Sequence, residues 1–274
     1  MRFIIYNPAT QLFTLFIDAL QKIYECIYYD ESNTYDYKND ILLILINPHF
    51  IFDNTNIKNE IYKISQTFRF KILYLSEPIN YLIEKRVYKD IINIIKPYCL
   101  WTYTSSNLNI FLLKIFNIYP FNQTYIDDIY DKNIKNIVFI GNINKHRIEI
   151  CNKFDNLINI KDRWDVKDHM EIYSKYLIYL NIHRRPKCES IELFRIIPIL
   201  ANGGVIISEK CNIIDQNRFK DYNIIFTDTV YETYENYIKN IDYSNILLKR
   251  ELFRKDMSYI LEFNKYIEYH NRCI

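Results

Sequence analysis

Short apolar runs alternate with amphipathic segments along the first 118 residues. The run ILLILIN at 41–47 has no polar alternation, which is typical of a strand covered on both faces. Apolar residues at helical spacing from Leu12 to Ile23 predict one helix after the first strand. The pattern predicts strands at 3–6, 24–29, 41–47, 71–78 and 98–103, and helices at 12–23, 57–68, 80–95 and 105–116.

The same alternation starts again at residue 136. It predicts strands at 136–140, 157–160, 177–182, 204–208 and 223–227. The helices between them are predicted from about 144, at 167–175 and at 189–201. Pro198 is expected to kink the last of these helices, because proline removes one main-chain donor. Residues 243–268 suit one or two long closing helices.

Alternating strands and helices predict an α/β fold with parallel sheets covered on both faces. The polar stretch before residue 136 lacks a clear period and is typical of a hinge. We therefore expect an acceptor-side domain at 1–122, a hinge at 123–135 and a second domain at 136–274 that includes the C-terminal helix. The expected architecture is two doubly wound, Rossmann-like domains that face a cleft and are closed by that helix.

Composition restricts the class of protein. Apolar residues make up 49% of the chain, enough for a core, and the net charge of +2 gives no strong basic field for nucleic acid. The six cysteines form no C-x-x-C pair, which favours a reduced, cytoplasmic chain. The longest purely apolar run, 41–46, is much shorter than the ~20 residues of a transmembrane helix, and the N-terminus lacks a signal-peptide pattern.

The chain has only three glycines, and all of them lie in its second half: Gly141, Gly203 and Gly204. Glycine is required where φ is positive or where a ligand approaches the main chain. The segments around them, VFIGNINKHR and LFRIIPILANGGVIISE, therefore predict ligand-facing turns at the ends of parallel strands.

Ligands of open parallel sheets bind outside the carboxyl ends of the strands. That rule selects Asn7, Asn47, His49 and Glu77 in the first domain, and Gly141, Asn142, His183, Arg184 and Glu209 in the second. His49 and Glu77 are both able to act as a general base. Glu77, followed by Pro78, is equally consistent with an exposed turn.

Cations surround two of these strand ends. Lys145 and Arg147 follow Gly141 at the start of a predicted helix, which suits a phosphate; the alternative is a solvated basic face. His183 precedes a basic run that begins at Arg184, and this segment is either a ligand site or a solvated loop.

Glu192 and Arg195 are three residues apart, on one face of a predicted helix. One interpretation is a surface ion pair worth about 0.3 kcal/mol. The other is that Glu192 accepts hydrogen bonds from ribose hydroxyls while Arg195 orients it or contacts phosphate.

Several known motifs are absent from the sequence. It contains no G-x-G-x-x-G, no G-x-x-x-x-G-K-[ST], no H-E-x-x-H and no G-x-S-x-G. It also contains no Asp-x-Asp, which argues against the metal-dependent sugar transferases built on that motif. We therefore expect no metal site and no cofactor.

Three segments in the second half resemble the GT-B glycosyltransferases of the broad group 1 class, nearest to those of large DNA viruses and some bacteria. They are FIGNINKHR (139–147), SKYLIYLNIHRRPKCESIELFR (174–195) and ILANGGVIISE (199–209). In the first half, YLSEP, WTYTSSN and IYPFN resemble the family more loosely. Many group 1 enzymes carry a second glutamate where this chain has Pro198.

The resemblance implies a nucleotide-sugar donor bound by the second domain and a glycan or other hydroxyl acceptor bound by the first. The donor-binding residues it implies are Gly141, Asn142, Lys145, Arg147, Asn181, His183, Arg184, Glu192, Arg195, Gly203, Gly204 and Glu209. The leading hypothesis is a metal-independent hexosyltransferase with His49, Glu77 or His183 in catalysis. The alternatives are a GT-B sugar-nucleotide epimerase and a non-catalytic nucleotide-sugar-binding or structural module. No nucleic-acid partner is expected.

Overall fold

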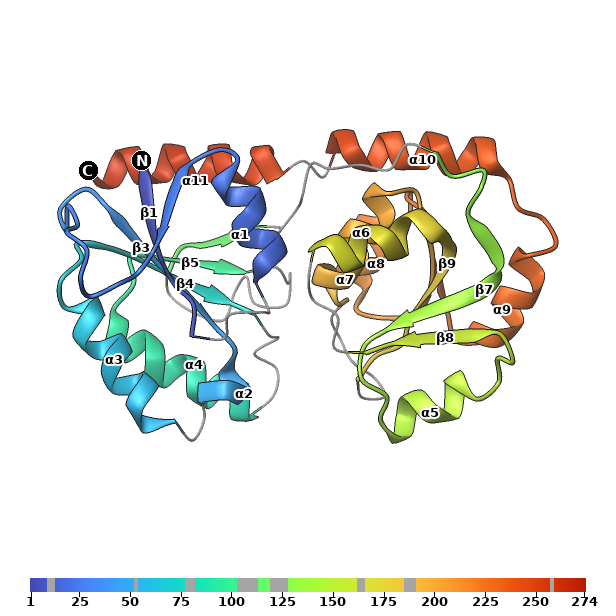
Figure 1. Ribbon diagram of the computed structural model, residues 1–274, viewed down its shortest axis with the longest axis horizontal. Coiled ribbons are helices and arrows are strands. Elements are labelled where there is room, and N and C mark those ends of the chain that lie inside the picture. Colours follow the sequence, from blue (N-terminus) through green and yellow to red (C-terminus); the bar gives the residue numbers. More distant parts are fainter. Residues whose placement is uncertain are drawn as a thin grey trace. The chain divides into compact units, whose positions relative to one another are not determined.

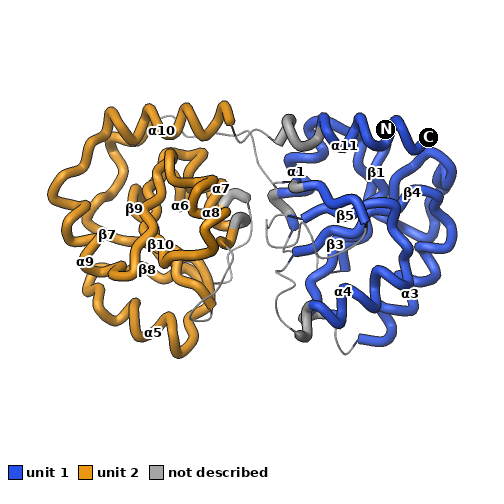
Figure 2. Tube along the Cα trace, turned by 180° about the vertical axis from the view of Figure 1, so that it is seen from behind, with its two compact units in different colours: residues 1–120, 259–274 blue, residues 121–258 orange. Residues whose placement is uncertain are grey.

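The computed structural model describes residues 1–8, 13–51, 54–76, 82–102, 113–118, 128–161, 166–184, 191–256 and 259–274. The chain forms two compact units (Figure 2). Unit 1 comprises Met1–Pro120 and Tyr259–Ile274, and unit 2 comprises Phe121–Ser258. Unit 1 is therefore built from two stretches of chain that are distant in sequence.

Unit 1 contains a six-stranded sheet in the order β2-β1-β3-β4-β5-β6. Its strands are β1 (Arg2–Tyr6), β2 (Glu25–Tyr28), β3 (Ile41–Ile46), β4 (Phe70–Leu75), β5 (Cys99–Thr102) and β6 (Ile115–Asn117). Every neighbouring pair is parallel. All six residues of β3 are buried, as the unbroken apolar run predicts.

Helices cover both faces of this sheet (Figure 1). They are α1 (Thr14–Gln21), α2 (Pro48–Ile51), α3 (Thr55–Ser65), α4 (Leu82–Ile95) and α11 (Tyr259–Cys273). One face packs its alternate strand residues, such as Ile4 and Leu73, against α3 and α4. On the other face, Phe3 and Trp101 contact Tyr266 of α11, with ring centroids 6.4 and 5.0 Å away.

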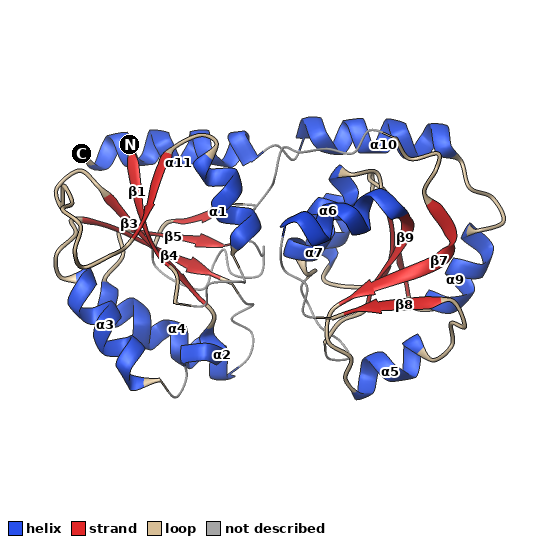
Figure 3. Cartoon of the chain, viewed as in Figure 1, coloured by secondary structure: helices blue, strands red, loops and turns tan. Residues whose placement is uncertain are grey.

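Unit 2 contains a five-stranded parallel sheet in the order β11-β10-β9-β7-β8. Its strands are β7 (Asn133–Ile140), β8 (Leu157–Ile160), β9 (Tyr176–Asn181), β10 (Val205–Glu209) and β11 (Ile224–Thr227). Its helices are α5 (Lys145–Cys151), α6 (Val166–Lys175), α7 (Leu193–Ala201), α8 (Ile213–Phe219), α9 (Val230–Tyr237) and α10 (Tyr243–Asp256). Figure 3 shows the same alternation of strand and helix in both units.

The structure confirms the predicted α/β class with two parallel sheets and corrects several elements. Ile115–Asn117 is a strand, β6, although a helix is expected over 105–116; residues 103–112 lie outside the described residues. This strand has only three residues, and it is specified by pairing with β5 rather than by a local period. The short helices α2, α8 and α9 are additional to the predicted elements.

The expected domain limits also need correction. Tyr259–Ile274 belongs to unit 1, although the second domain is expected to continue to residue 274. The physical reason is the aromatic face of α11, where Tyr266 donates to or accepts from Tyr98 at 2.6 Å. Most of the expected hinge 123–135 lies outside the described residues or in unit 2, where β7 already begins at Asn133. A cleft between the domains stays a prediction.

Within the described residues, no helix combines the length and apolarity needed to cross a membrane.

Lys132 is a buried cation just before β7, with 4% of its surface exposed. Its Nζ donates to the main-chain oxygen of Asn202 near the end of α7, at 2.5 Å. Burial, followed by the nearby Arg250 and Arg254, lowers the pKa of Lys132 to about 7, while Asp128 opposes the shift. The folded protein therefore binds this proton less tightly than the unfolded chain does.

Lys132→Met is expected to reduce the amount by which the free energy of unfolding increases with pH. Between pH 7 and the ordinary lysine pKa of 10.5, the unfolded chain carries a proton that folded Lys132 has lost, so stability increases with pH. The wild-type free energy of unfolding should gain about 2 kcal/mol more than the variant between pH 7 and pH 9. Urea unfolding at both pH values measures it, and parallel pH profiles would contradict it.

Candidate functional site

The carboxyl ends of β7 and β9 form the switch point of the unit 2 sheet. The chain moves outward from β7 to β8 and then returns across β7 to β9, so the connections diverge between β7 and β9. In doubly wound sheets, ligands bind at this place. Gly141 follows β7, and Ile182 and His183 follow β9.

Gly141 allows the chain to turn at the end of β7. Its φ is +140°, which favours glycine, and an added Cβ would lie 2.9 Å from a terminal nitrogen of Arg195. Three residues later, Asn144 is the N-cap of α5, and its side chain accepts a hydrogen bond from the Arg147 N–H at 3.0 Å. The cap fixes the start of the helix that carries Arg147.

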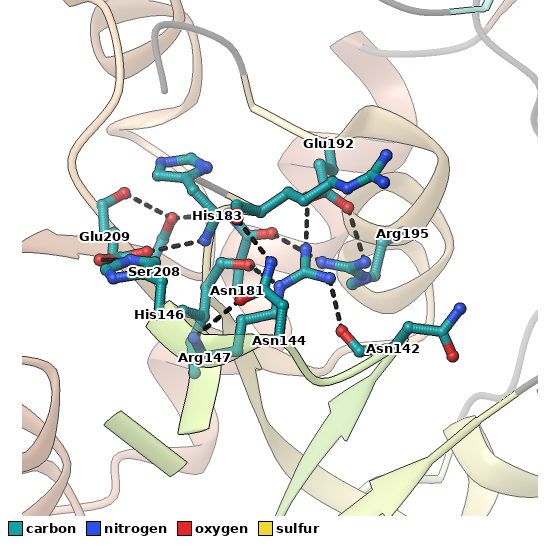
Figure 4. Close-up of polar contacts among 12 residues, drawn as sticks. Asn142, Asn144, His146, Arg147, Asn181, His183, Glu192, Arg195, Ser208 and Glu209 are labelled. Carbon is teal, nitrogen blue, oxygen red and sulfur yellow. Dashed lines mark hydrogen bonds and ion pairs between the residues drawn. The ribbon is translucent and has the colours of Figure 1, made fainter. Parts of the chain in front are cut away.

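Arg147 is buried and joins three parts of the site (Figure 4). Its guanidinium donates to the main-chain oxygens of Ile182 at 3.1 Å and Asn142 at 2.8 Å. It also donates to Glu192 Oε1 at 2.8 Å. One side chain thus links the β7 loop, the end of β9 and the residue that precedes α7.

Glu192 bridges two buried arginines. Its other oxygen, Oε2, lies 2.6 Å from a terminal nitrogen of Arg195. The side chains of Arg147 and Arg195 are 6% and 8% exposed, whereas that of Glu192 is 32% exposed. Both guanidiniums also lie over the ring of Phe139, at 5.1 and 5.3 Å from its centroid.

This arrangement carries a positive charge in a mostly buried place. Two guanidiniums share one carboxylate, so the three side chains together have a net charge of +1. Burial lowers the pKa of Arg147, and Glu192 counteracts that effect. A partly desolvated cation attracts anions more strongly than an exposed one does.

A second polar group lies on β9 and β10. Asn181 donates to Ser208 Oγ at 2.9 Å, and both side chains are fully buried. Glu209 accepts from the His183 main-chain N–H at 2.7 Å and contacts His146 Nε2 at 2.9 Å. These bonds fix the ends of two neighbouring strands and the first turn of α5.

Two buried nitrogens in the site lack hydrogen-bond partners among the described residues: His183 Nδ1 and Arg195 Nε. His183 is 1% exposed, and its Nε2 bonds to the Lys210 main-chain oxygen at 3.1 Å. An unpaired buried polar group costs roughly 1–3 kcal/mol, so such groups are rare away from places where a ligand pairs them.

The structure brings most of the expected donor residues to one place. These bonds and contacts connect eight of them: Gly141, Asn142, Arg147, Asn181, His183, Glu192, Arg195 and Glu209. The exposed Lys145 lies at the start of α5, and the main-chain oxygen of the exposed Arg184 accepts from Asn144 at 2.6 Å. Glu77 lies outside the described residues, and for His49 the structure describes only its place in α2.

The interpretation of Glu192 and Arg195 as a surface ion pair is wrong, because Arg195 is 8% exposed. Glu192 also precedes α7 as its N-cap residue, whereas the sequence predicts a helix over 189–201 that contains it. Asn144, His146 and Ser208 also belong to the site, although they are not among the residues expected from the sequence. Of these, Asn144 has a recognisable pattern, since Asn is favoured at helix N-caps.

The structure places Gly203 and Gly204 apart from the other expected donor residues. They precede Val205, the first residue of β10, and so lie at the amino edge of the sheet, opposite the polar cluster. Gly203 has φ +71°, and a Cβ on Gly204 would lie 2.5 Å from Ile199 Cγ2 and 2.9 Å from Tyr179 Cε2. Gly204 allows α7 to pack closely on the sheet, whereas Gly203 allows Ile129 and Arg250 to approach the turn.

Gly204→Ala is therefore expected to destabilise the protein by about 1–3 kcal/mol through overpacking. Any ligand affinity of the carboxyl-edge cluster should remain unchanged in the folded variant. Thermal unfolding and nucleotide titration measure the two effects. A variant of normal stability with weakened nucleotide binding would contradict this placement.

The sequence matches no protein-family model and no curated protein. Its fold, however, is similar to solved glycosyltransferases. An alpha-glucosyltransferase in complex with UDP-glucose and DNA containing an abasic site has a TM-score of 0.65 and 11% identity, over 98% of both chains. T4 phage BGT with UDP and Mn²⁺ has a TM-score of 0.60 and 10% identity, over 98% of this chain and 99% of that one.

A bacterial structure extends the same similarity. Anabaena HepE in complex with UDP and glucose has a TM-score of 0.61 and 7% identity, over 98% of this chain and 99% of that one. The similarity spans nearly the whole of each chain. This protein therefore has the α/β fold, with two parallel sheets, of GT-B glycosyltransferases.

Proposed function

We propose that this protein is a glycosyltransferase that moves a sugar from a UDP-linked donor to a hydroxyl acceptor. One observation carries the proposal: the Arg147–Glu192–Arg195 cluster lies at the switch point of unit 2. Solved glycosyltransferases with a similar fold contain UDP, UDP-glucose, or UDP with glucose. A cationic group at a sheet switch point suits a nucleoside diphosphate.

The cluster offers different chemistry to different parts of the donor. The unpaired Nε of Arg195 and the positive charge of both arginines suit the diphosphate. Glu192 is one-third exposed, so its remaining lone pairs can accept ribose hydroxyls while the arginines hold its orientation. Gly141 allows the β7 loop to pass close to Arg195, since an added Cβ would lie 2.9 Å from a terminal nitrogen of that guanidinium.

In the proposed reaction, the bond between the anomeric carbon and the diphosphate oxygen breaks. The acceptor oxygen forms the new bond to that carbon, and its proton passes to a base. Arg147 and Arg195 would stabilise the charge that develops on the leaving diphosphate, which is a large contribution in many enzymes. His183, His49 and Glu77 remain the candidates for the base.

Metal independence and hexose transfer are further parts of the proposal. Two arginines provide positive charge that a divalent ion provides in other transferases. Activity should therefore persist in EDTA. A strict requirement for added Mn²⁺ would contradict this part alone.

A panel of nucleotide sugars tests the function. Pure protein is incubated with UDP-, GDP- and dTDP-sugars and a mixed acceptor panel, and released nucleoside diphosphate is measured. Release of UDP that depends on acceptor supports the transferase. A rise in melting temperature with UDP-sugars but no turnover would instead support the non-catalytic binding module, since ligands that bind only the native state stabilise it.

A further inference from the structure

The sheet of unit 1 has its own switch point, and Asn7 lies there. The order β2-β1-β3 places the divergence between β1 and β3, and Asn7 directly follows β1. Asn7 is 9% exposed. Neither its Oδ1 nor its Nδ2 has a hydrogen-bond partner among the residues that the structure describes.

At the ends of two neighbouring strands, the buried polar side chains are paired within the protein. Ser76, after β4, donates its hydroxyl to the Ile46 main-chain oxygen at 2.8 Å. Thr102, at the end of β5, donates to the Leu75 main-chain oxygen at 3.3 Å. Buried amides are usually paired in this way, so an amide with both ends unpaired needs an explanation. A ligand that both donates and accepts a hydrogen bond provides one.

The sequence around this edge restricts the charge of such a ligand. Although 35 of the 274 residues are Lys or Arg, none occurs in the segments that follow the first five strands, namely 7–21, 29–37, 47–57, 76–84 and 102–113. In unit 2, by contrast, Arg147 and Arg184 follow the ends of β7 and β9 within a few residues. The same five segments contain seven Asp or Glu residues, so the carboxyl edge of unit 1 disfavours a polyanion.

We propose that the carboxyl edge of unit 1 binds an uncharged, hydroxyl-bearing acceptor, and that the Asn7 amide is a specificity-determining contact. A hydroxyl can accept from Nδ2 and donate to Oδ1, which satisfies both ends of the amide. The inference rests on the proposed transferase function and names its acceptor class. It separates this chain from the structural neighbours that were solved with DNA.

The first experiment compares acceptors in the UDP-release assay. The probes are a panel of neutral mono- and oligosaccharides and a 13-mer duplex DNA with a hydroxymethylated base. We expect neutral saccharides to stimulate release at least tenfold more than DNA, with little dependence on salt. Preferential use of DNA, with stimulation that falls steeply as salt rises, would overturn the proposal.

The second experiment uses Asn7→Leu, which has a similar size and no polar atoms. It should raise the acceptor KM at least tenfold, keep the UDP-induced rise in melting temperature and increase the melting temperature of the free protein. The increase is expected because an unpaired buried amide is removed. A purely structural role for Asn7 predicts a lower melting temperature and an unchanged acceptor KM, and that result would overturn the proposal.

Ser76→Ala is the matched control at the same edge. It removes a hydroxyl that is already paired within the protein, so the melting temperature should fall and the acceptor KM should stay within about twofold. If no nucleotide sugar is turned over, the proposed function fails, and calorimetry with the neutral saccharides then tests the site by itself. Equal binding to wild type and to Asn7→Leu, or no binding, would overturn it.

Discussion

Glu192→Ala is expected to lower the free energy of unfolding by about 3 kcal/mol. The substitution removes the carboxylate that bonds Arg147 at 2.8 Å and Arg195 at 2.6 Å, and it leaves two buried guanidiniums next to each other without an anion. The value lies at the low end for a broken buried ion pair, because the Glu192 side chain is 32% exposed. Urea unfolding followed by circular dichroism measures the loss.

Glu149→Ala is the control, because Glu149 is an exposed carboxylate on α5. Its stability should match that of the wild type within about 0.5 kcal/mol. The free energy of unfolding of Glu192→Gln should lie between those of Glu192→Ala and Glu149→Ala, since glutamine keeps one acceptor oxygen but loses the charge. If Glu192→Ala proved as stable as Glu149→Ala, the two arginines would not depend on this carboxylate.

Arg195→Met is expected to weaken UDP binding roughly ten- to a hundredfold, the equivalent of one charge-assisted hydrogen bond. Arg195 brings an unpaired Nε and a buried positive charge to the β7 loop, where it would contact the diphosphate. Calorimetric titration with UDP measures the affinity. Addition of salt should reduce the difference between wild type and variant only slightly, because the site is buried.

Arg250→Met provides a matched control for this experiment. Arg250 is 7% exposed, close to the 8% of Arg195, but it lies on α10 beside Gly203, at the amino edge of the sheet. Its replacement should lower the free energy of unfolding and leave the affinity for UDP unchanged. Equal losses of affinity in both variants would mean that the effect comes from the fold of unit 2 and not from contact with the nucleotide.

Local pattern was sufficient to predict most of the fold. The buried strands of both sheets have apolar runs, and the parallel arrangement follows from their alternation with helices. The errors occur where long-range contacts determine the element. Strand β6 is specified by β5, and the assignment of α11 to unit 1 follows from contacts such as Tyr98–Tyr266, which are 168 residues apart.

The sequence pattern selects most of the residues that the structure connects at the carboxyl edge of unit 2, but not the bonds between them. Helical spacing relates Glu192 only to Arg195, whereas its bond to Arg147 spans 45 residues and depends on the sheet order. For the same reason, the burial of Arg147 has no sequence pattern. Gly203 and Gly204 do mark a close approach to the main chain, and the approaching atoms belong to the side chains of Ile129, Arg250, Ile199 and Tyr179.

The two-part composition of unit 1 affects how the chain folds during synthesis. Residues 121–258 form a continuous unit, whereas unit 1 is complete only after residues 259–274 have joined residues 1–120. At about 5–20 residues per second, translation of the intervening stretch takes on the order of ten seconds or more. During that interval, Trp101 lacks the edge-on contact with Tyr266 that helps to bury it in the complete fold.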